Sequence, residues 1–297
     1  MKTVRFMDLD CIELDNGNVN LLASVSAGPR ILSLKLNGGP NLLAELPEKI
    51  TETELHGPYR FFGGHRLWHA PEDINRTYYP DDRPVNVAEL DGGVLLTQSA
   101  DPVYGIEKSV FIRLEEGRAR VHVDHAITNR GEELLEGAPW AITMLQPGGY
   151  AILPQETDDT GFLSNRRLTL WPYTDVRSPY LLWGNKFILV DCSMTAEAER
   201  LKLGFPNRRG WLACWLGGTL FVKHSLYEPH ADYPDFGASS QCYCCDLFVE
   251  LETLGPLARL EPGESATHGE TWDLHADVPF QPDEDFVQRI AESLRLT

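Results

Sequence analysis

The stretch FGGHRLWHAPE, residues 62–72, gathers histidine, arginine, tryptophan and glutamate in one short segment. His65, His69 and Glu72 have the spacing that zinc ligands take on one face of a helix. Two glycines before them and a proline within the segment oppose a helix. In an extended chain, residues four apart are separated by about 13 Å, too far to share one ion. We therefore expect no metal site here.

Arg66 and Trp68 in the same stretch fit a sugar site better. Carbohydrates present flat C–H faces and rings of hydroxyl groups, so their sites combine aromatic surfaces with bidentate polar side chains. Trp140 is a second candidate platform among the seven tryptophans, although core packing is the commoner role of a single tryptophan. Arg66 is harder to explain as a core residue, because a buried guanidinium needs an acidic partner.

A second stretch, residues 242–252, alternates between two faces and predicts one continuous strand. Its polar face would carry Asp246, Glu250 and Glu252, of which Glu250 and Glu252 would be about 7 Å apart. Like charges on one face raise each other's pKa, which prepares a carboxyl group for acid–base chemistry near neutral pH. A solvated outer face explains the same pattern equally well.

The third stretch, residues 221–235, ends a predicted strand at Lys223 and continues into a loop with Tyr233 and Asp235. Loops at strand ends often carry ligand groups. Lys223 and His224 point to opposite faces of the strand, so only one of them can share a site with a neighbouring strand.

Period-two alternation dominates the rest of the chain and predicts the strands that must position these residues. Residues 108–115 and 118–129 form a predicted hairpin across Glu116 and Gly117. The tail, residues 283–296, has the only clear helical stripe, with Asp283 placed to cap it. No linker interrupts the chain. We expect one all-β domain over residues 1–297, a large antiparallel sandwich or barrel with a short C-terminal helix.

The composition excludes several classes of function. The chain has 26 Lys and Arg against 44 Asp and Glu, a net charge of −18. Such a charge repels nucleic acid and anionic lipid, so we expect neither as a partner. No apolar run is long enough for a membrane span, and no secretory signal is visible, so we expect a cytoplasmic protein. The six cysteines lack the spacing of a disulfide scaffold or zinc finger.

A set of short motifs lies in order along the chain: AGPRIL (27–32), NLL (41–43), GGHRLW (63–68) with PE (71–72), APW (138–140), YPD (233–235), ELETLGP (250–256), LEPGES (260–265) and HGETW (268–272). Together they resemble the galactose mutarotase-like (aldose 1-epimerase) superfamily, and in particular a bacterial branch with a GGHRLW motif. The resemblance spans residues 10–275. It implies a β-supersandwich that binds a small-molecule carbohydrate on a concave sheet face, without a cofactor; it defines no oligomeric state.

In the family, a glutamate late in the chain takes the proton of the anomeric hydroxyl and a histidine donates a proton to the ring oxygen. The resemblance implies that Glu250 is the base and that His65 helps to hold the sugar. The family's acid histidine has no counterpart at Pro139–Trp140. Either His65, Lys223 or a loop histidine serves as the acid, or this branch does not epimerise aldoses. The remaining groups implied to bind substrate are Arg66, Trp68, Glu72, Trp140, Tyr233 and Asp235.

Three functions are compatible with these residues. The first is a mutarotase or epimerase that uses acid–base catalysis on a sugar or sugar derivative. The second is a non-catalytic carbohydrate-binding or sensing domain, which the missing histidine favours. The third is a lyase or glycoside hydrolase, in which Glu72 or Asp235 would partner Glu250 across the cleaved bond.

Overall fold

Two large antiparallel sheets make up most of the computed structural model, which describes residues 1–90 and 92–296. The first sheet has the order β1 (Lys2–Phe6), β2 (Leu9–Asp15), β3 (Val19–Ser24), β4 (Arg30–Leu36), β7 (His65–Ala70), β12 (Leu135–Leu145), β21 (Val249–Leu254), β20 (Ser240–Cys244), β17 (Leu201–Phe205) and β14 (Thr169–Leu170), and β22 (Ala258–Leu260) also pairs with β12. The second sheet has the order β15 (Leu181–Trp183), β16 (Phe187–Asp191), β13 (Tyr150–Pro154), β18 (Trp211–Leu216), β19 (Thr219–Ser225), β23 (Ser265–His275), β11 (Arg120–Asn129), β10 (Ile106–Leu114), β9 (Gly93–Gln98) and β8 (Asn86–Leu90).

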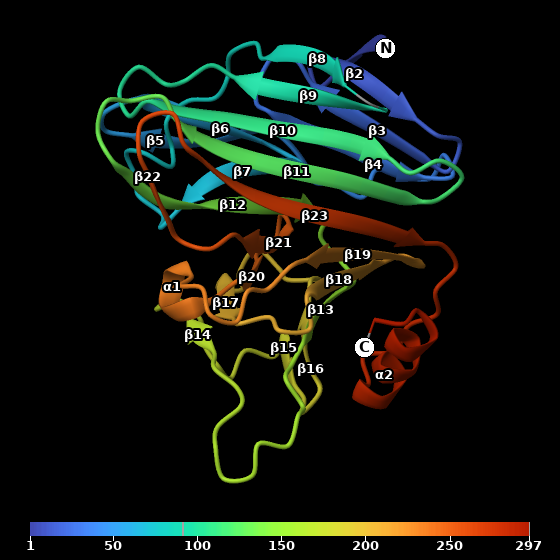
Figure 1. Ribbon diagram of the computed structural model, residues 1–297. Coiled ribbons are helices and arrows are strands. Elements are labelled where there is room, and N and C mark those ends of the chain that lie inside the picture. The colour runs from blue at the N-terminus through green and yellow to red at the C-terminus, as the bar shows by residue number, and fades with distance from the viewer. Residues whose placement is uncertain (91, 297) are drawn as a thin grey trace.

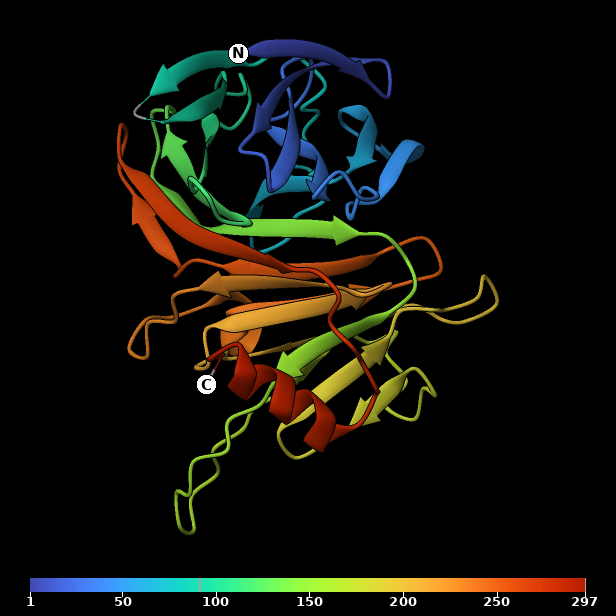
Figure 2. The same ribbon diagram turned by 90° about the vertical axis from the view of Figure 1, so that its right-hand side faces the viewer.

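The core lies between these sheets. Alternate side chains of both sheets point inward, such as Leu21 and Ile31 from the first and Val123 and Phe221 from the second, and all four are buried in one apolar cluster. Figure 1 shows β10 and β11 in front of β3 and β4, and Figure 2 shows the same layers from the side. The expected all-β sandwich is therefore confirmed.

The local predictions for the hairpin and the helix are also confirmed. β10 and β11 pair up to Leu114 and Val121, and Gly117 in the turn has a positive φ of 70°. The helix α2 (Glu284–Ser293) begins after Asp283, whose side chain accepts a hydrogen bond from the Phe286 N–H. This cap satisfies one of the free N–H groups at the helix start. The second helix in the described residues is a single short turn, α1 (Pro234–Gly237).

The prediction of one strand over residues 242–252 is wrong. The segment is a hairpin in which β20 and β21 are joined by a turn, and the Cys245 N–H donates to the Phe248 carbonyl oxygen at 3.1 Å. The turn changes which side chains share a face. Tyr243 lies directly opposite Glu250, while Asp246 sits in the turn and leaves the row of carboxylates.

A smaller two-stranded sheet of β5 (Glu45–Thr53) and β6 (Gly57–Gly63) stands beside the outer face of the first sheet. Gly63 and Gly64 connect it to β7, with φ of 85° and 71°. A Cβ atom at either position would collide with a backbone carbonyl oxygen, that of Ala44 or that of Ile31. Glycine is therefore required at both positions of this connection.

None of the described helices is long and apolar enough to cross a membrane.

Candidate functional site

A groove of about 360 Å³ opens on the outer face of the first sheet, away from the core between the sheets. Strands β7, β12, β21, β20 and β17 form its floor, β5 and β6 form one wall, and the segment after β14 forms another. It is lined by Lys49, Thr51, Phe61, Arg66, Trp68, Glu72, Tyr78, Trp140, Ile142, Trp171, Tyr173, Arg200, Lys202, Tyr243, Phe248 and Glu250.

Strand register explains why residues distant in sequence meet here. Arg66 lies opposite Ile142, and Trp68 lies opposite Trp140 on the neighbouring strand. Residues directly opposite each other in an antiparallel pair point to the same face. Alternate residues of each strand therefore line the groove, and the residues between them face the core.

Glu250 is held at the floor by Arg66. The Arg66 Nη2 atom lies 3.1 Å from Glu250 Oε1, and the guanidinium stacks 4.1 Å from the centre of the Trp68 ring. Both residues are buried, but Glu250 retains 8% of its surface at the groove. Arg66 therefore has the acidic partner that the sequence required of it, and the partner is the predicted catalytic glutamate.

Glu252 lies on the same face but beneath the groove, fully buried. Its Oε2 atom accepts hydrogen bonds from Trp140 Nε1 at 2.7 Å and from Lys202 Nζ at 2.9 Å. Its other oxygen, Oε1, has no hydrogen-bond partner among the described residues. Burial raises the pKa of Glu252 to about 7; Lys202 opposes this effect and Glu250 adds to it. Glu252 can therefore be protonated near neutral pH, and the main cause is its burial rather than the neighbouring carboxylate.

Aromatic rings surround the polar floor. Trp68 and Trp140 meet edge to face at 5.4 Å, and each exposes only 3% of its surface, so they offer edges rather than broad faces to a ligand. Trp171, Tyr173 and Tyr243 are less buried and also line the groove. Aromatic faces beside carboxylate and ammonium groups are the surfaces that a sugar ring requires.

Sequence reasoning missed several of these residues. Lys202 is the lone charge in the apolar strand LKLGF, and this was the available signal for a buried, paired lysine. The turn at residues 245–248 brings Tyr243 to the same face as Glu250, whereas one continuous strand would place these two residues on opposite faces. Trp171 and Tyr173 follow a long irregular segment, so no strand pattern placed them.

Glu72 and Tyr78 form the rim of the groove beside Trp68. The Tyr78 hydroxyl donates to Glu72 Oε1 at 2.6 Å, and its ring packs 4.8 Å from the Trp68 ring. Burial, followed by the neighbouring Glu72, raises the pKa of Tyr78 above its usual value. Glu72 and Glu250 therefore both line the groove.

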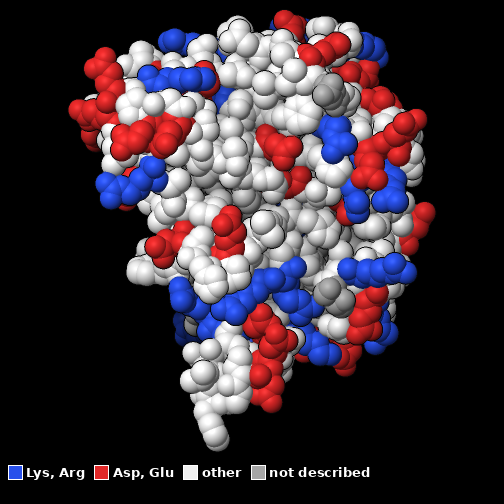
Figure 3. All heavy atoms as spheres, in the orientation of Figure 1, with Lys and Arg blue, Asp and Glu red and all other residues white. Residues whose placement is uncertain are grey.

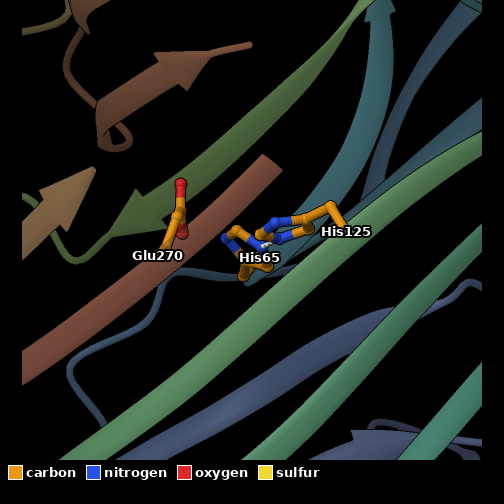
Figure 4. Close-up of side chains that lie close together, drawn as sticks. All are labelled: His65, His125 and Glu270. Atoms are coloured by element: carbon orange, nitrogen blue, oxygen red, sulfur yellow. Dashed lines mark hydrogen bonds between the residues drawn. The ribbon is translucent and has the colours of Figure 1, made fainter. Parts of the chain in front are cut away.

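His65 does not face the groove. It precedes Arg66 on the same strand and so points to the opposite face, where it is 1% exposed. Its Nδ1 lies 2.9 Å from the Thr143 hydroxyl and its Nε2 lies 2.7 Å from His125 Nε2 (Figure 4). Burial lowers the pKa of His65 well below its usual range. The expectation that both His65 and Arg66 contact a ligand is therefore wrong.

Lys223 is also directed into the core. Its Nζ atom lies 2.8 Å from Glu270 Oε1, and both side chains are fully buried. Burial alone would raise the pKa of Glu270, but Lys223 and the three neighbouring histidines together outweigh it and lower this pKa well below the usual range. The ammonium group is therefore held in an ion pair on the far side of the first sheet from Glu250, and the expectation that it serves as an acid in the groove is wrong.

Tyr233 and Asp235 lie in the loop around α1, outside the groove lining. Tyr233 is buried, stacks on Tyr227 with ring centres 5.5 Å apart, and accepts a hydrogen bond from the Glu228 N–H at 2.9 Å. Asp235 accepts a hydrogen bond from Gln241 Nε2 at 2.6 Å. Both residues have structural partners, and Tyr233 lines a neighbouring hollow instead.

His65, His125 and Glu270 bring their possible ligand atoms within 4.8 Å of one another (Figure 4). Two features oppose a cation in this cluster. The two imidazoles already hydrogen-bond to each other, and the Lys223 ammonium occupies the Glu270 carboxylate. A cation would have to displace both contacts and lie beside a positive charge, which costs energy in a buried site.

No protein-family model and no curated protein matches this sequence. Solved structures do match. A Klebsiella pneumoniae protein, provisionally assigned as an aldose 1-epimerase, has a TM-score of 0.62 and 10% identity over 97% of this chain and 83% of its own. An Escherichia coli protein with the same provisional assignment has a TM-score of 0.57 and 14% identity over 90% of this chain and 99% of its own.

A galactose mutarotase-like protein from Lactobacillus casei has a TM-score of 0.54 and 11% identity over 89% of this chain and its own full length. At such identities a similarity in structure establishes the fold, whereas function depends on the residues of the site. The sheet topology and the similarity to these structures over most of both chains together show that this chain has the galactose mutarotase-like fold.

Proposed function

We propose that the protein is an enzyme that binds a sugar in the groove and interconverts its anomers, with Glu250 as the general base. The observation that carries the proposal is the Glu250 carboxylate, which reaches the groove floor between the Arg66 guanidinium and a ring of aromatic side chains. The similarity to aldose 1-epimerase-like structures supports a sugar as the ligand.

The chemistry needs one proton acceptor and one proton donor. Glu250 would take the proton of the anomeric hydroxyl as the bond between the anomeric carbon and the ring oxygen breaks. The ring oxygen would take a proton from the donor, leaving an open-chain aldehyde. Rotation about the adjacent carbon–carbon bond and the reverse steps close the ring on the other face and return both protons.

Lys202 is the donor that the geometry supports. Tyr243 lies opposite both Glu250 on β21 and Lys202 on β17, so the three residues form one row across three strands. The backbones at the two ends of this row are about 10 Å apart. The Lys202 side chain extends from β17 toward β21, where its Nζ atom lies 2.9 Å from Glu252 Oε2. A sugar ring over Tyr243 would therefore lie close to both the Glu250 carboxylate and the Lys202 ammonium.

The variant Glu250→Gln tests the proposal. It keeps the shape of the side chain but removes the base, and we expect anomer exchange to slow by about 100-fold or more. Exchange is measured by NMR magnetisation transfer across a panel of aldoses and uronic acids. The exposed variant Glu136→Gln is the matched control. If Glu250→Gln exchanged every accepted sugar as fast as the parent protein, Glu250 would not be the base.

A non-catalytic sugar-binding domain is the second candidate, and one observation favours it. Among the described residues that line the groove, none is a histidine. A binding domain would bind a sugar, as measured by calorimetry, without accelerating anomer exchange. Its affinity would fall with Trp68→Ala and remain unchanged with Glu250→Gln.

A further inference from the structure

A second hollow, of about 800 Å³, lies on the protein surface next to the groove, and we name it the basic hollow. Three arginines from two separate segments line it, Arg166 and Arg167 before β14 and Arg208 after β17. Lys and Arg side chains gather in a band across this part of the surface, at the level where Figure 1 draws β14 and β17 (Figure 3). In a chain with a net charge of −18, such a band is a local reversal of sign.

The three guanidinium groups have no carboxylate partner within 4.0 Å among the described residues. Backbone carbonyls orient two of them: Arg166 Nε donates to the Glu156 carbonyl oxygen at 2.9 Å, and Arg167 Nη1 donates to that of Phe236 at 2.7 Å. Such contacts order a guanidinium without neutralising its charge. The arginines therefore keep their capacity to bind an anion.

Two acidic residues, Glu156 and Asp232, also line the basic hollow. The Glu156 carboxylate is occupied within its own loop, where Oε1 accepts hydrogen bonds from the Thr157 and Asp158 N–H groups at 2.9 and 3.2 Å. The balance of charge in the basic hollow remains positive.

Two features link the basic hollow to the groove. The segment of β14 carries Arg167 in the basic hollow and Trp171 in the groove. Tyr233 of the basic hollow also packs in the same apolar cluster as Trp140 of the groove. A ligand that extends from the groove past Trp140 and Trp171 would reach the arginines.

We propose that the basic hollow is a second subsite that binds an anionic group, a carboxylate or a phosphate, attached to the sugar that occupies the groove. This inference rests on the proposed function for the identity of the group in the groove. Arginine binds both anions through paired N–H donors, so the shared chemistry is recognition of a planar or tetrahedral oxyanion. The substrate class is then an acidic sugar derivative larger than one unmodified ring.

Isothermal titration calorimetry on the full chain tests the subsite. The probes are galacturonic acid, digalacturonate and trigalacturonate for carboxylates, galactose 6-phosphate for phosphate, and neutral galactose and galactobiose for comparison. We expect at least one acidic probe to bind about tenfold or more tightly than the neutral sugar of the same length. The acidic probe that binds more tightly identifies the anion, and its length gives the distance of the anion from the groove.

The triple variant Arg166→Gln, Arg167→Gln and Arg208→Gln should lose this gain and keep the affinity for neutral sugars. The control removes three exposed arginines elsewhere, Arg83, Arg113 and Arg289, by the same substitution and so changes the net charge equally. Equal loss in both triple variants, or no gain for any acidic probe, would overturn the subsite.

Failure of the subsite and failure of the proposed function give different results. If neutral galactose binds and exchanges its anomers but no acidic probe binds more tightly than its neutral counterpart, the subsite proposal is wrong and the proposed function stands. If acidic probes bind through the three arginines but no sugar exchanges its anomers faster than in buffer, the subsite stands and the enzymatic proposal is wrong.

Discussion

At the scale of single residues, the raised pKa of Glu252 predicts a pH dependence of the protein's stability. Its pKa lies near 7, above the model-peptide value of 4.5, first because it is buried. The folded protein therefore holds the Glu252 proton more tightly than the unfolded chain does. This contribution favours the fold below about pH 4.5 and is lost as the pH rises through about 7.

The variant Glu252→Gln should remove this pH dependence. We expect the free energy of unfolding of the parent protein to fall by about 2 to 3 kcal/mol relative to the variant between pH 5 and pH 8. Urea unfolding at several pH values measures the difference. The exposed variant Glu116→Gln serves as the control, and a constant offset between parent and Glu252→Gln across this range would contradict the assignment.

At the scale of elements, α2 covers a patch of the second sheet on the face that points away from the core. Val287 and Ala291 are buried there against residues of β13, β18 and β19, including Trp211 and Val222 (Figure 2). The apolar stripe that predicted the helix is therefore also its docking surface. Because the groove lies on the other sheet, this contact stabilises the fold without touching the site.

Val287→Ala should destabilise the protein by about 2 kcal/mol, the cost of two buried methylene equivalents and a partial cavity. Sugar affinity should not change. Urea unfolding and calorimetry measure the two quantities. Arg289→Ala, on the exposed side of the same helix, should cost far less, and similar losses from both variants would mean that α2 is not docked as described.

At the scale of the whole molecule, Lys223 joins the two sheets. It belongs to β19 of the second sheet, where it pairs with Glu270 of β23, and its Nζ also donates to the carbonyl oxygens of Ala141 and Leu251 in the first sheet. The buried ammonium thus satisfies backbone groups of both layers. A buried charge with these partners is costly to disrupt on one side only.

Lys223→Met should therefore lower the free energy of unfolding by about 3 to 5 kcal/mol, since Glu270 would remain buried without its partner. The double variant with Glu270→Gln should recover part of this loss. Lys186→Met removes a surface ion pair with Asp285 and should cost about 1 kcal/mol or less. If Lys223→Met cost no more than Lys186→Met, Lys223 would not connect the sheets.

The sequence by itself determined the fold class. Side chains of a strand alternate between two faces, so a period of two residues identified strands such as β10, β11 and β18 and left only the tail as a helix. The motifs then indicated the galactose mutarotase-like fold. The same alternation placed Arg66 and Trp68 on one face of their strand, and Glu250 and Glu252 on one face of theirs.

The tertiary structure decided which of these faces meet. A strand pattern distinguishes two faces but does not show which one points toward the core between the sheets. The register of β7, β12 and β21 is what shows that His65 and Lys223 lie on the other side of the first sheet from Glu250. Lys202 reached the groove only through the pairing of β17 with β20, a contact between segments about forty residues apart. The proposed chemistry depends on that pairing, because it brings the Lys202 ammonium into the groove that Glu250 also lines.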